Sequence, residues 1–253
     1  MTKIITVTNQ KGGVGKTTTT STLAVVLKRQ GYKVLAIDMD PQGNMSFALG
    51  ADNVINATIY DVLKGEIRPQ FAIQHTSTVD VIPSNILLSG IELEFTSAGR
   101  EYLLKNAINS IKGFYDYILI DTPPALSVLT VNALAASTHV MIPMVCDIFS
   151  VQGITQLCEG IEKVKELCNA DLEIAGVVVN KYNGRILLNR EVKEAAEMVF
   201  KDLDIPMFKQ TIRNSIALTE AQASQKDLVS YAPKNGVIRD YIYLIKEMKE
   251  RGV

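Results

Sequence analysis

The chain has 253 residues, of which 47% are hydrophobic and 21% are charged, and its 26 Lys and Arg nearly balance its 27 Asp and Glu. This composition excludes a disordered, collagen-like or disulfide-stabilised chain, and the net charge of −1 gives no global sign of a nucleic-acid or anionic-membrane binder. Three cysteines without CxxC spacing indicate neither a disulfide framework nor a thiolate metal site, so we expect a reducing cytoplasmic environment.

Short aliphatic and β-branched runs predict six strands that are apolar on both faces, as buried parallel strands are. The runs are Ile4 to Thr8, Lys33 to Asp38, Val79 to Pro83, Tyr117 to Asp121, His139 to Val145 and Ile174 to Asn180. Helical spacing predicts crossover helices over Thr17 to Arg29, Ser97 to Lys112, Gly153 to Cys168 and Leu187 to Lys201. This alternation predicts an α/β fold with a mostly parallel twisted sheet, helices on both faces and ligand-binding loops along one edge.

The chain contains no Gly-, Ser- or Pro-rich linker, so residues 1–253 are predicted to form a single domain. A final helix places five apolar side chains on one face, and we expect this face to pack on the sheet. They are Ile238, Tyr241, Ile242, Ile245 and Met248. A helix lying on a membrane surface is the alternative interpretation of the same pattern. No stretch reaches the roughly 18 apolar residues that a membrane span needs.

The strongest motif lies between the first predicted strand and the first predicted helix, where a phosphate-binding loop occurs. It consists of Lys11, Gly12, Gly13, Val14, Gly15, Lys16, Thr17 and Thr18. Its glycines allow backbone N–H groups to surround phosphate oxygens at the positive end of a helix. Lys16 is predicted to reach the β- and γ-phosphates, and the Thr17 hydroxyl to ligate Mg²⁺. The alternative is a glycine-rich turn with solvated lysines.

The motif departs from the usual pattern, since Gln10 stands where the first glycine is expected and Lys11 follows it. With three further blocks, this loop resembles the ParA/Soj branch of the ParA/MinD partition ATPases, which are P-loop NTPases of the deviant Walker A type, over essentially the whole chain. The blocks are AIDMDPQGN at 36–44, YILIDTPP at 117–124, and Ile212-Arg213 followed by Glu220-Ala221. The resemblance implies that Lys11 reaches across a homodimer interface to the partner's nucleotide.

Two aspartates complete the predicted ATP and Mg²⁺ site. Asp121 ends an aliphatic strand, so its carboxylate should lie at the ligand edge near Thr17 and hold Mg²⁺ through water. The resemblance makes Asp40 the catalytic residue that positions the attacking water, beside the catalytic lysines Lys11 and Lys16. A buried capping role for Asp121 and a turn-forming role for Asp40 are the alternatives. Asp38 is interpreted as support for the loop that carries Asp40.

The adenine pocket is expected at the end of the last strand. Asn180 offers both a donor and an acceptor there, which suits the exocyclic amine and a ring nitrogen of adenine, and the resemblance also implies this contact. The segment from Ile205 and Pro206 to Arg213 is expected to complete the pocket, mostly through backbone groups. A turn-forming Asn180 is the alternative.

The resemblance implies that ATP drives dimerisation, that the dimer binds DNA non-specifically on the nucleoid, and that a centromere-binding, ParB-like partner stimulates hydrolysis. Residues 181–253 hold 13 Lys and Arg against 10 Asp and Glu, which provides a mild local positive charge. Candidate DNA contacts are Arg185, Arg190 and Arg213, although an ordinary solvated face explains the same charge. Gln222 to Asp227 departs from the family pattern, which leaves the role of that segment open.

Three other functions use the same loop. A MinD-like membrane-cycling ATPase needs an exposed amphipathic tail, and no membrane partner is expected because the final helix is assigned to packing. A nitrogenase-type reductase needs cysteines arranged to hold a cluster between subunits, and Cys146, Cys158 and Cys168 do not supply that arrangement. A dethiobiotin synthetase is the other metabolic alternative.

Overall fold

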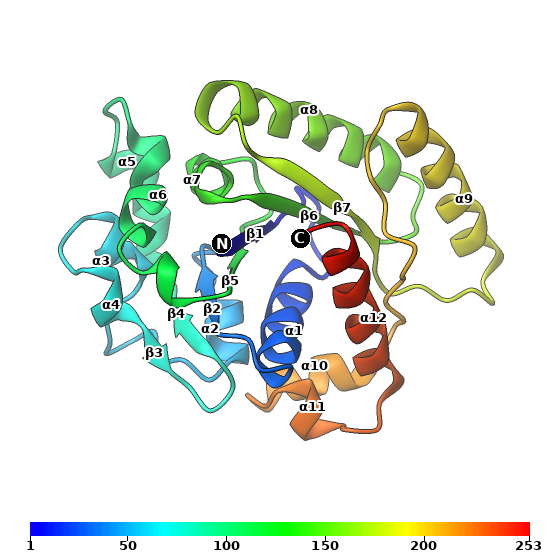
Figure 1. Ribbon diagram of the computed structural model, residues 1–253, viewed down its shortest axis with the longest axis horizontal. Helices are drawn as coiled ribbons and strands as arrows, with labels where there is room; N and C mark the ends of the chain where they lie inside the picture. The colour runs from blue at the N-terminus through cyan, green and yellow to red at the C-terminus, as the bar shows by residue number, and fades with distance from the viewer.

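The computed structural model describes the backbone of residues 1–253 and every side chain except that of Glu92. Seven strands form one sheet in the order β3-β4-β2-β5-β1-β6-β7, and all neighbouring pairs are parallel except β3 with β4 (Figure 1). The strands are β1 (Lys3–Val7), β2 (Val34–Asp38), β3 (Gln74–His75), β4 (Asp80–Ile82), β5 (Tyr117–Asp121), β6 (His139–Met144) and β7 (Glu173–Val179). The predicted α/β class is confirmed. Only the two-residue β3 escaped prediction.

Helices cover both faces of the sheet, because each central strand carries apolar side chains on both sides. One face is covered by α1 (Lys16–Arg29), α2 (Asn44–Ala48), α10 (Ile216–Ala223), α11 (Leu228–Tyr231) and α12 (Gly236–Glu250). The other carries α3 (Ile59–Leu63), α4 (Pro69–Ala72), α5 (Ile91–Glu94), α6 (Leu103–Ile108), α7 (Val128–Ala136), α8 (Ser150–Cys168) and α9 (Leu187–Asp202). Three 3₁₀ helices complete the chain: η1 (Ile86–Gly90), η2 (Arg100–Tyr102) and η3 (Lys112–Phe114).

The continuous helix predicted from Ser97 to Lys112 was wrong, because the segment divides into η2, α6 and η3. Asn132 on α7 maintains the first break. Its Oδ1 accepts a hydrogen bond from the Leu104 N–H at 3.1 Å, and its Nδ2 donates to the Arg100 carbonyl at 2.8 Å. Since a side chain from another helix satisfies these backbone groups, the interruption of the helical hydrogen bonds costs little.

The final helix packs as predicted at four of its five apolar positions. Ile238, Tyr241, Ile245 and Met248 are buried against α1 within the same core as the sheet, whereas Ile242 is 41% exposed and its assignment to this face was wrong. Leu244, which was not among the five predicted positions, is buried on this face instead. None of the helices among the described residues is long and apolar enough to cross a membrane.

The parallel strands bring their carboxyl ends to one edge of the sheet. Asp38 at the end of β2 and Val7 at the end of β1 are both in register with Asp121 at the end of β5. The phosphate-binding loop, which follows Val7, therefore begins beside Asp38 and Asp121. These two aspartates come 31 and 114 residues after Val7 in the sequence, and the parallel sheet brings them to the same edge.

Candidate nucleotide-binding site

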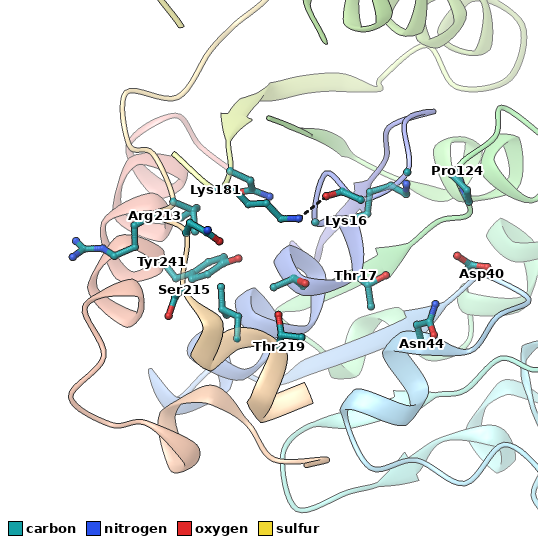
Figure 2. A pocket seen from close by; sticks show the side chains of 18 of the residues that line it. Lys16, Thr17, Asp40, Asn44, Pro124, Lys181, Arg213, Ser215, Thr219 and Tyr241 are labelled. Atoms are coloured by element: carbon teal, nitrogen blue, oxygen red, sulfur yellow. Dashed lines mark hydrogen bonds between the residues drawn. The ribbon is translucent and has the colours of Figure 1, made fainter. Parts of the chain in front are cut away.

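A cavity of about 410 Å³ opens at this edge of the sheet (Figure 2). Its lining comes from the loop after β1, the loop after β2, the end of β7 and the segment that leads into α10. The lining residues are Gly12, Gly13, Gly15, Lys16, Thr17, Thr18, Asp40, Gln42, Asn44, Pro124, Asn180, Lys181, Ile212, Arg213, Asn214, Ser215, Leu218, Thr219 and Tyr241. The volume falls within the range of small-molecule sites.

The loop after β1 requires glycine at two positions. Gly13 and Gly15 have φ values of 74° and 91°, in the left-handed region that other residues rarely adopt. A Cβ on Gly15 would also lie 2.9 Å from Nδ2 of Asn180. Gly15 is the N-cap of α1, so the glycines present the positive end of this helix to the cavity. Val14, by contrast, is fully buried and does not line the cavity.

Lys16 is the buried cation of the site, with only 7% of its surface exposed. Its Nζ donates to the carbonyl of Lys11 at 3.2 Å. Burial lowers its pKa from the ordinary value, and the carboxylates of Asp121 and Asp40 oppose that shift. A cation held at the first turn of α1 beside the curled loop is well placed to contact an anionic ligand.

Thr17 and Asp121 form the oxygen-donor pair expected of a Mg²⁺ site. The Thr17 hydroxyl, which lines the cavity, donates to Oδ2 of Asp121 at 2.6 Å. Asp121 lies behind it and is fully buried, and both burial and the neighbouring Asp38 carboxylate raise its pKa. A hydroxyl backed by a carboxylate fits a hard cation that keeps part of its water shell.

Asp40 lines the cavity from the loop after β2 and is 8% exposed. Its Oδ1 accepts from the N–H of Gln42 at 3.0 Å, and its carbonyl accepts from the N–H of Gly43 at 2.9 Å. Figure 2 places Asp40, Asn44 and Thr17 toward one side of the cavity. The carboxylate therefore faces the end of the cavity where the phosphate loop and Thr17 lie.

Asn180 lines the cavity beside the phosphate-binding loop and is 4% exposed. Its Nδ2 donates to the carbonyl of Val14 at 3.0 Å and to the hydroxyl of Thr19 at 2.9 Å. Its Oδ1 is buried, and among the described residues it has no hydrogen-bond partner. The protein therefore already uses the donor side of this amide, and only the acceptor is free for a ligand's amino group, not both groups as the sequence suggested.

The structure does not bring Pro206 to the cavity. The Pro206 carbonyl accepts from the N–H of Val177 at 2.8 Å, so this segment runs alongside the middle of β7. Only the end of the predicted pocket segment, Ile212 and Arg213, reaches the lining. The expectation that Pro206 lines the base pocket was therefore wrong, because its segment runs beside β7 before the chain turns into the cavity at Ile212.

Several lining residues were not identified from the sequence. Lys181, with φ of 53°, reaches back so that its Nζ donates to the Gly13 carbonyl at 2.9 Å (Figure 2). Thr219 comes from α10, and Tyr241 comes from α12, where burial raises its pKa to about 12. Tyr241 belongs to the apolar stripe of the last helix, which explains why the sequence pattern indicated only a core residue.

Lys11 does not line the cavity and is held by its own chain. Its Nζ forms an ion pair with Oδ2 of Asp147, in the loop after β6, and both side chains are partly exposed. Burial opposes the charge of Asp147, but the hydrogen bond and charge of Lys11 and the backbone N–H of Phe149 outweigh it, so the pKa of this carboxyl lies below its usual value. The expected orientation toward a facing subunit is therefore not the one observed in the isolated chain.

The three arginines proposed to contact DNA have different surroundings. Arg185 and Arg190 are exposed, and neither forms an ion pair with another described residue. Arg213 binds Asp240 through two contacts, with Nε to Oδ2 at 2.6 Å and Nη2 to Oδ1 at 2.7 Å. The Asp240 side chain is only 7% exposed, so Arg213 compensates a buried charge.

We expect Arg213→Ala to lower the free energy of unfolding by about 1–3 kcal/mol, because Asp240 would keep its burial and lose its cation. Urea denaturation measures the change. Arg185→Ala and Arg190→Ala are matched controls, for which we expect changes of no more than about 0.5 kcal/mol. Equal stability of all three variants would show that the ion pair contributes nothing to folding.

Comparisons with known proteins agree with this geometry. Residues 2–174 match a family described as an AAA domain. The chain is 38% identical to the sporulation initiation inhibitor protein Soj of Bacillus subtilis, with 100% of both chains covered. It is 39% identical to the chromosome partitioning protein ParA of Caulobacter vibrioides, with 98% of this chain and 94% of the relative covered.

Two solved structures share the fold. A cobyrinic acid a,c-diamide synthase from Mycobacterium smegmatis, with bound ADP and magnesium, has a TM-score of 0.79 at 34% identity, covering 89% of this chain and 93% of that one. The cell division ATPase MinD of Pyrococcus furiosus has a TM-score of 0.79 at 28% identity, with 99% of both covered. Fold and phosphate loop together define a P-loop protein of the α/β class. Within that class, the chain belongs to the ParA/Soj family of partition ATPases.

Proposed function

We propose that residues 1–253 act as one ATPase domain that binds ATP, dimerises and segregates DNA. One observation carries this proposal: Lys16, the Thr17–Asp121 pair and Asp40 meet around one cavity. They do so in a chain that is 38–39% identical over nearly its full length to Soj and ParA. The ADP and magnesium in the similar M. smegmatis structure support the choice of ligand.

The residues of the site divide the work of phosphoryl transfer to water. Backbone N–H groups of Gly12 to Thr18, together with Lys16, would hold the phosphates. Thr17 and, through water, Asp121 would hold Mg²⁺, which when bound supplies positive charge next to the phosphate oxygens. Asp40 would accept a hydrogen bond from the attacking water and orient it. The free Oδ1 of Asn180 would accept from the adenine amino group.

Dimerisation would require Lys11 to leave Asp147 and to reach the nucleotide of a second copy. Both side chains are partly exposed, at 40% for Lys11 and 33% for Asp147, so water screens this pair and its exchange for a phosphate contact costs little. A trans lysine would neutralise phosphate charge that a single copy leaves open. ATP would thus favour the dimer, because the phosphates bound to the second copy carry more negative charge than the Asp147 carboxylate that Lys11 contacts in its own chain.

The dimer would bind DNA through phosphate contacts that ignore base sequence. We assign these contacts to the exposed Arg185 and Arg190, with Arg213 kept for its ion pair with Asp240. A ParB-like partner would stimulate hydrolysis and so release the dimer from the nucleoid.

Sedimentation of the chain with ATP, ADP or no nucleotide, with and without DNA, tests this proposal. We expect the chain to dimerise with ATP but not with ADP or without nucleotide, and to bind DNA only with ATP. DNA binding should weaken steeply as the salt concentration rises, because Lys and Arg contacts to phosphates release counterions. Flotation with anionic vesicles in place of DNA binding would favour a MinD-like membrane cycle. That alternative has the fold likeness to MinD in its favour, but the apolar face of α12 is buried against α1.

Asp40→Ala is expected to keep ATP binding and the ATP-dependent dimer and to reduce hydrolysis by about a hundredfold or more, because the variant retains the phosphate contacts and loses the water-orienting carboxylate. Phosphate release and calorimetry measure the two effects on one sample. Asp171→Ala is the control, since Asp171 is exposed and lies before β7, at the opposite edge of the sheet. Hydrolysis at the parent rate would remove Asp40 from the mechanism.

A further inference from the structure

The carboxylate of Asp40 has little support of its own. Among the described residues, its side chain accepts a hydrogen bond only from the backbone N–H of Gln42, which belongs to the same loop. Its position therefore depends on how the loop backbone is held. That backbone is fixed at Asp40 itself, whose N–H donates to Oδ1 of Asp38 at 3.1 Å.

Asp38 is held in turn by Ser46, at the start of the short helix α2. Oδ2 of Asp38 accepts from the Ser46 N–H at 2.8 Å and from the Ser46 hydroxyl at 2.7 Å. Both residues are fully buried, so no water competes for these contacts. The N–H and the hydroxyl of Ser46 thus together hold the carboxylate that fixes the backbone of Asp40.

The same hydroxyl also joins the loop to the neighbouring strand. Its oxygen accepts from the N–H of Ser84 at 2.9 Å, just after β4, which pairs with β2. Gly43 passes so close to this segment that a Cβ there would lie 2.9 Å from the Ser84 carbonyl, and its φ is 63°. One buried hydroxyl therefore connects the loop of Asp40 to two strands of the rigid sheet.

We propose that Ser46 is a positioning residue for hydrolysis, which holds Asp40 in place through Asp38 and ties the loop to the segment after β4. This inference rests on the proposed function of Asp40 as the residue that orients water. Ser46 does not line the cavity, so it acts on the water only through Asp38 and the loop backbone. If the loop that carries Asp40 moved slightly, the protein would still bind ATP. It would hydrolyse ATP slowly, because the Asp40 carboxylate would no longer be aligned with the attacking water.

The test is Ser46→Ala, with kcat and KM for ATP measured separately. We expect kcat to fall between about tenfold and a hundredfold, the range that a misplaced catalytic group costs, with KM unchanged because the phosphate contacts are intact. Ser84→Ala is the matched control. It removes a buried hydroxyl that has no partner among the described residues and keeps the backbone N–H that Ser46 uses, so kcat should equal that of the parent.

A double-variant cycle separates positioning from a general loss of structure. In an Asp40→Ala background, Ser46→Ala should cause no further fall in kcat, because its effect passes through Asp40. A parent-like kcat for Ser46→Ala, a raised KM, or an additional loss in the Asp40→Ala background would each overturn the inference. If Asp40→Ala already hydrolyses ATP at the uncatalysed rate, no further fall can be measured in that background. The kcat and KM of the single variant Ser46→Ala then test the inference. If Asp40→Ala hydrolyses ATP normally, the proposed function fails instead.

Discussion

Lys16→Ala is expected to abolish productive binding of ATP. Lys16 is 7% exposed at the first turn of α1, where it is the buried cation of the cavity lining. Its removal would leave phosphate charge without that partner, near the carboxylates of Asp121 and Asp40, whose negative charges also act on Lys16. Loss of one partner of a buried charge contact costs about 2–5 kcal/mol, or roughly thirtyfold to several thousandfold in Kd.

Calorimetric titration with ATP and Mg²⁺ measures this effect. Lys163→Ala is a suitable control, because Lys163 is an exposed lysine on α8, distant from the cavity lining. Its affinity for ATP should match that of the parent. Undiminished affinity in Lys16→Ala would show that the phosphate loop has been assigned wrongly.

Lys11→Ala is expected to behave differently, with monomeric ATP binding intact and the dimer lost. Lys11 does not line the cavity of its own chain and instead forms an ion pair with Asp147. If it acts in trans, its removal takes away a cation that only the second copy uses. ATP-dependent dimerisation, stimulated hydrolysis and DNA binding should then fall together, while Kd for ATP in the monomer remains close to that of the parent.

ATP affinity and dimer fraction should be measured on the same sample of Lys11→Ala. Asp147→Asn provides the opposite change, because it frees Lys11 from its own chain and should favour the ATP-dependent dimer. A collapse of ATP affinity in Lys11→Ala, with bound protein still able to dimerise, would mean that Lys11 serves its own nucleotide and that the trans assignment is wrong.

The strands and the phosphate loop could be predicted because their signals are local. Each core strand is a short apolar run buried on both faces, and the observed bounds differ from the predicted ones by one residue at most. The loop is equally local, since the glycines at 13 and 15 are adjacent in sequence to the lysine and threonines they serve. Asp121 could be placed near Thr17 because parallel strands end at one edge.

Contacts between distant segments could not be predicted in the same way. The division of the Ser97 to Lys112 helix depends on Asn132, and the state of Lys11 depends on Asp147, which lies 136 residues further along the chain. From the sequence Arg213 was predicted only as a surface cation, because nothing in the sequence indicates that it pairs with Asp240. Neither hydrophobic periodicity nor motif spacing predicts which distant side chain a carboxylate or amide will contact in the folded protein.

The sequence by itself determined the fold class, the phosphate loop and the family of this protein, because apolar periodicity and a contiguous glycine-rich motif are properties of neighbouring residues. Only the tertiary structure decided which residues line the cavity, that Asn180 has just its acceptor free, that Pro206 lies along β7, and that Ser46 stands behind Asp40. These features depend on burial and on hydrogen bonds between segments far apart in the chain, which arise only when the sheet and its helices pack together.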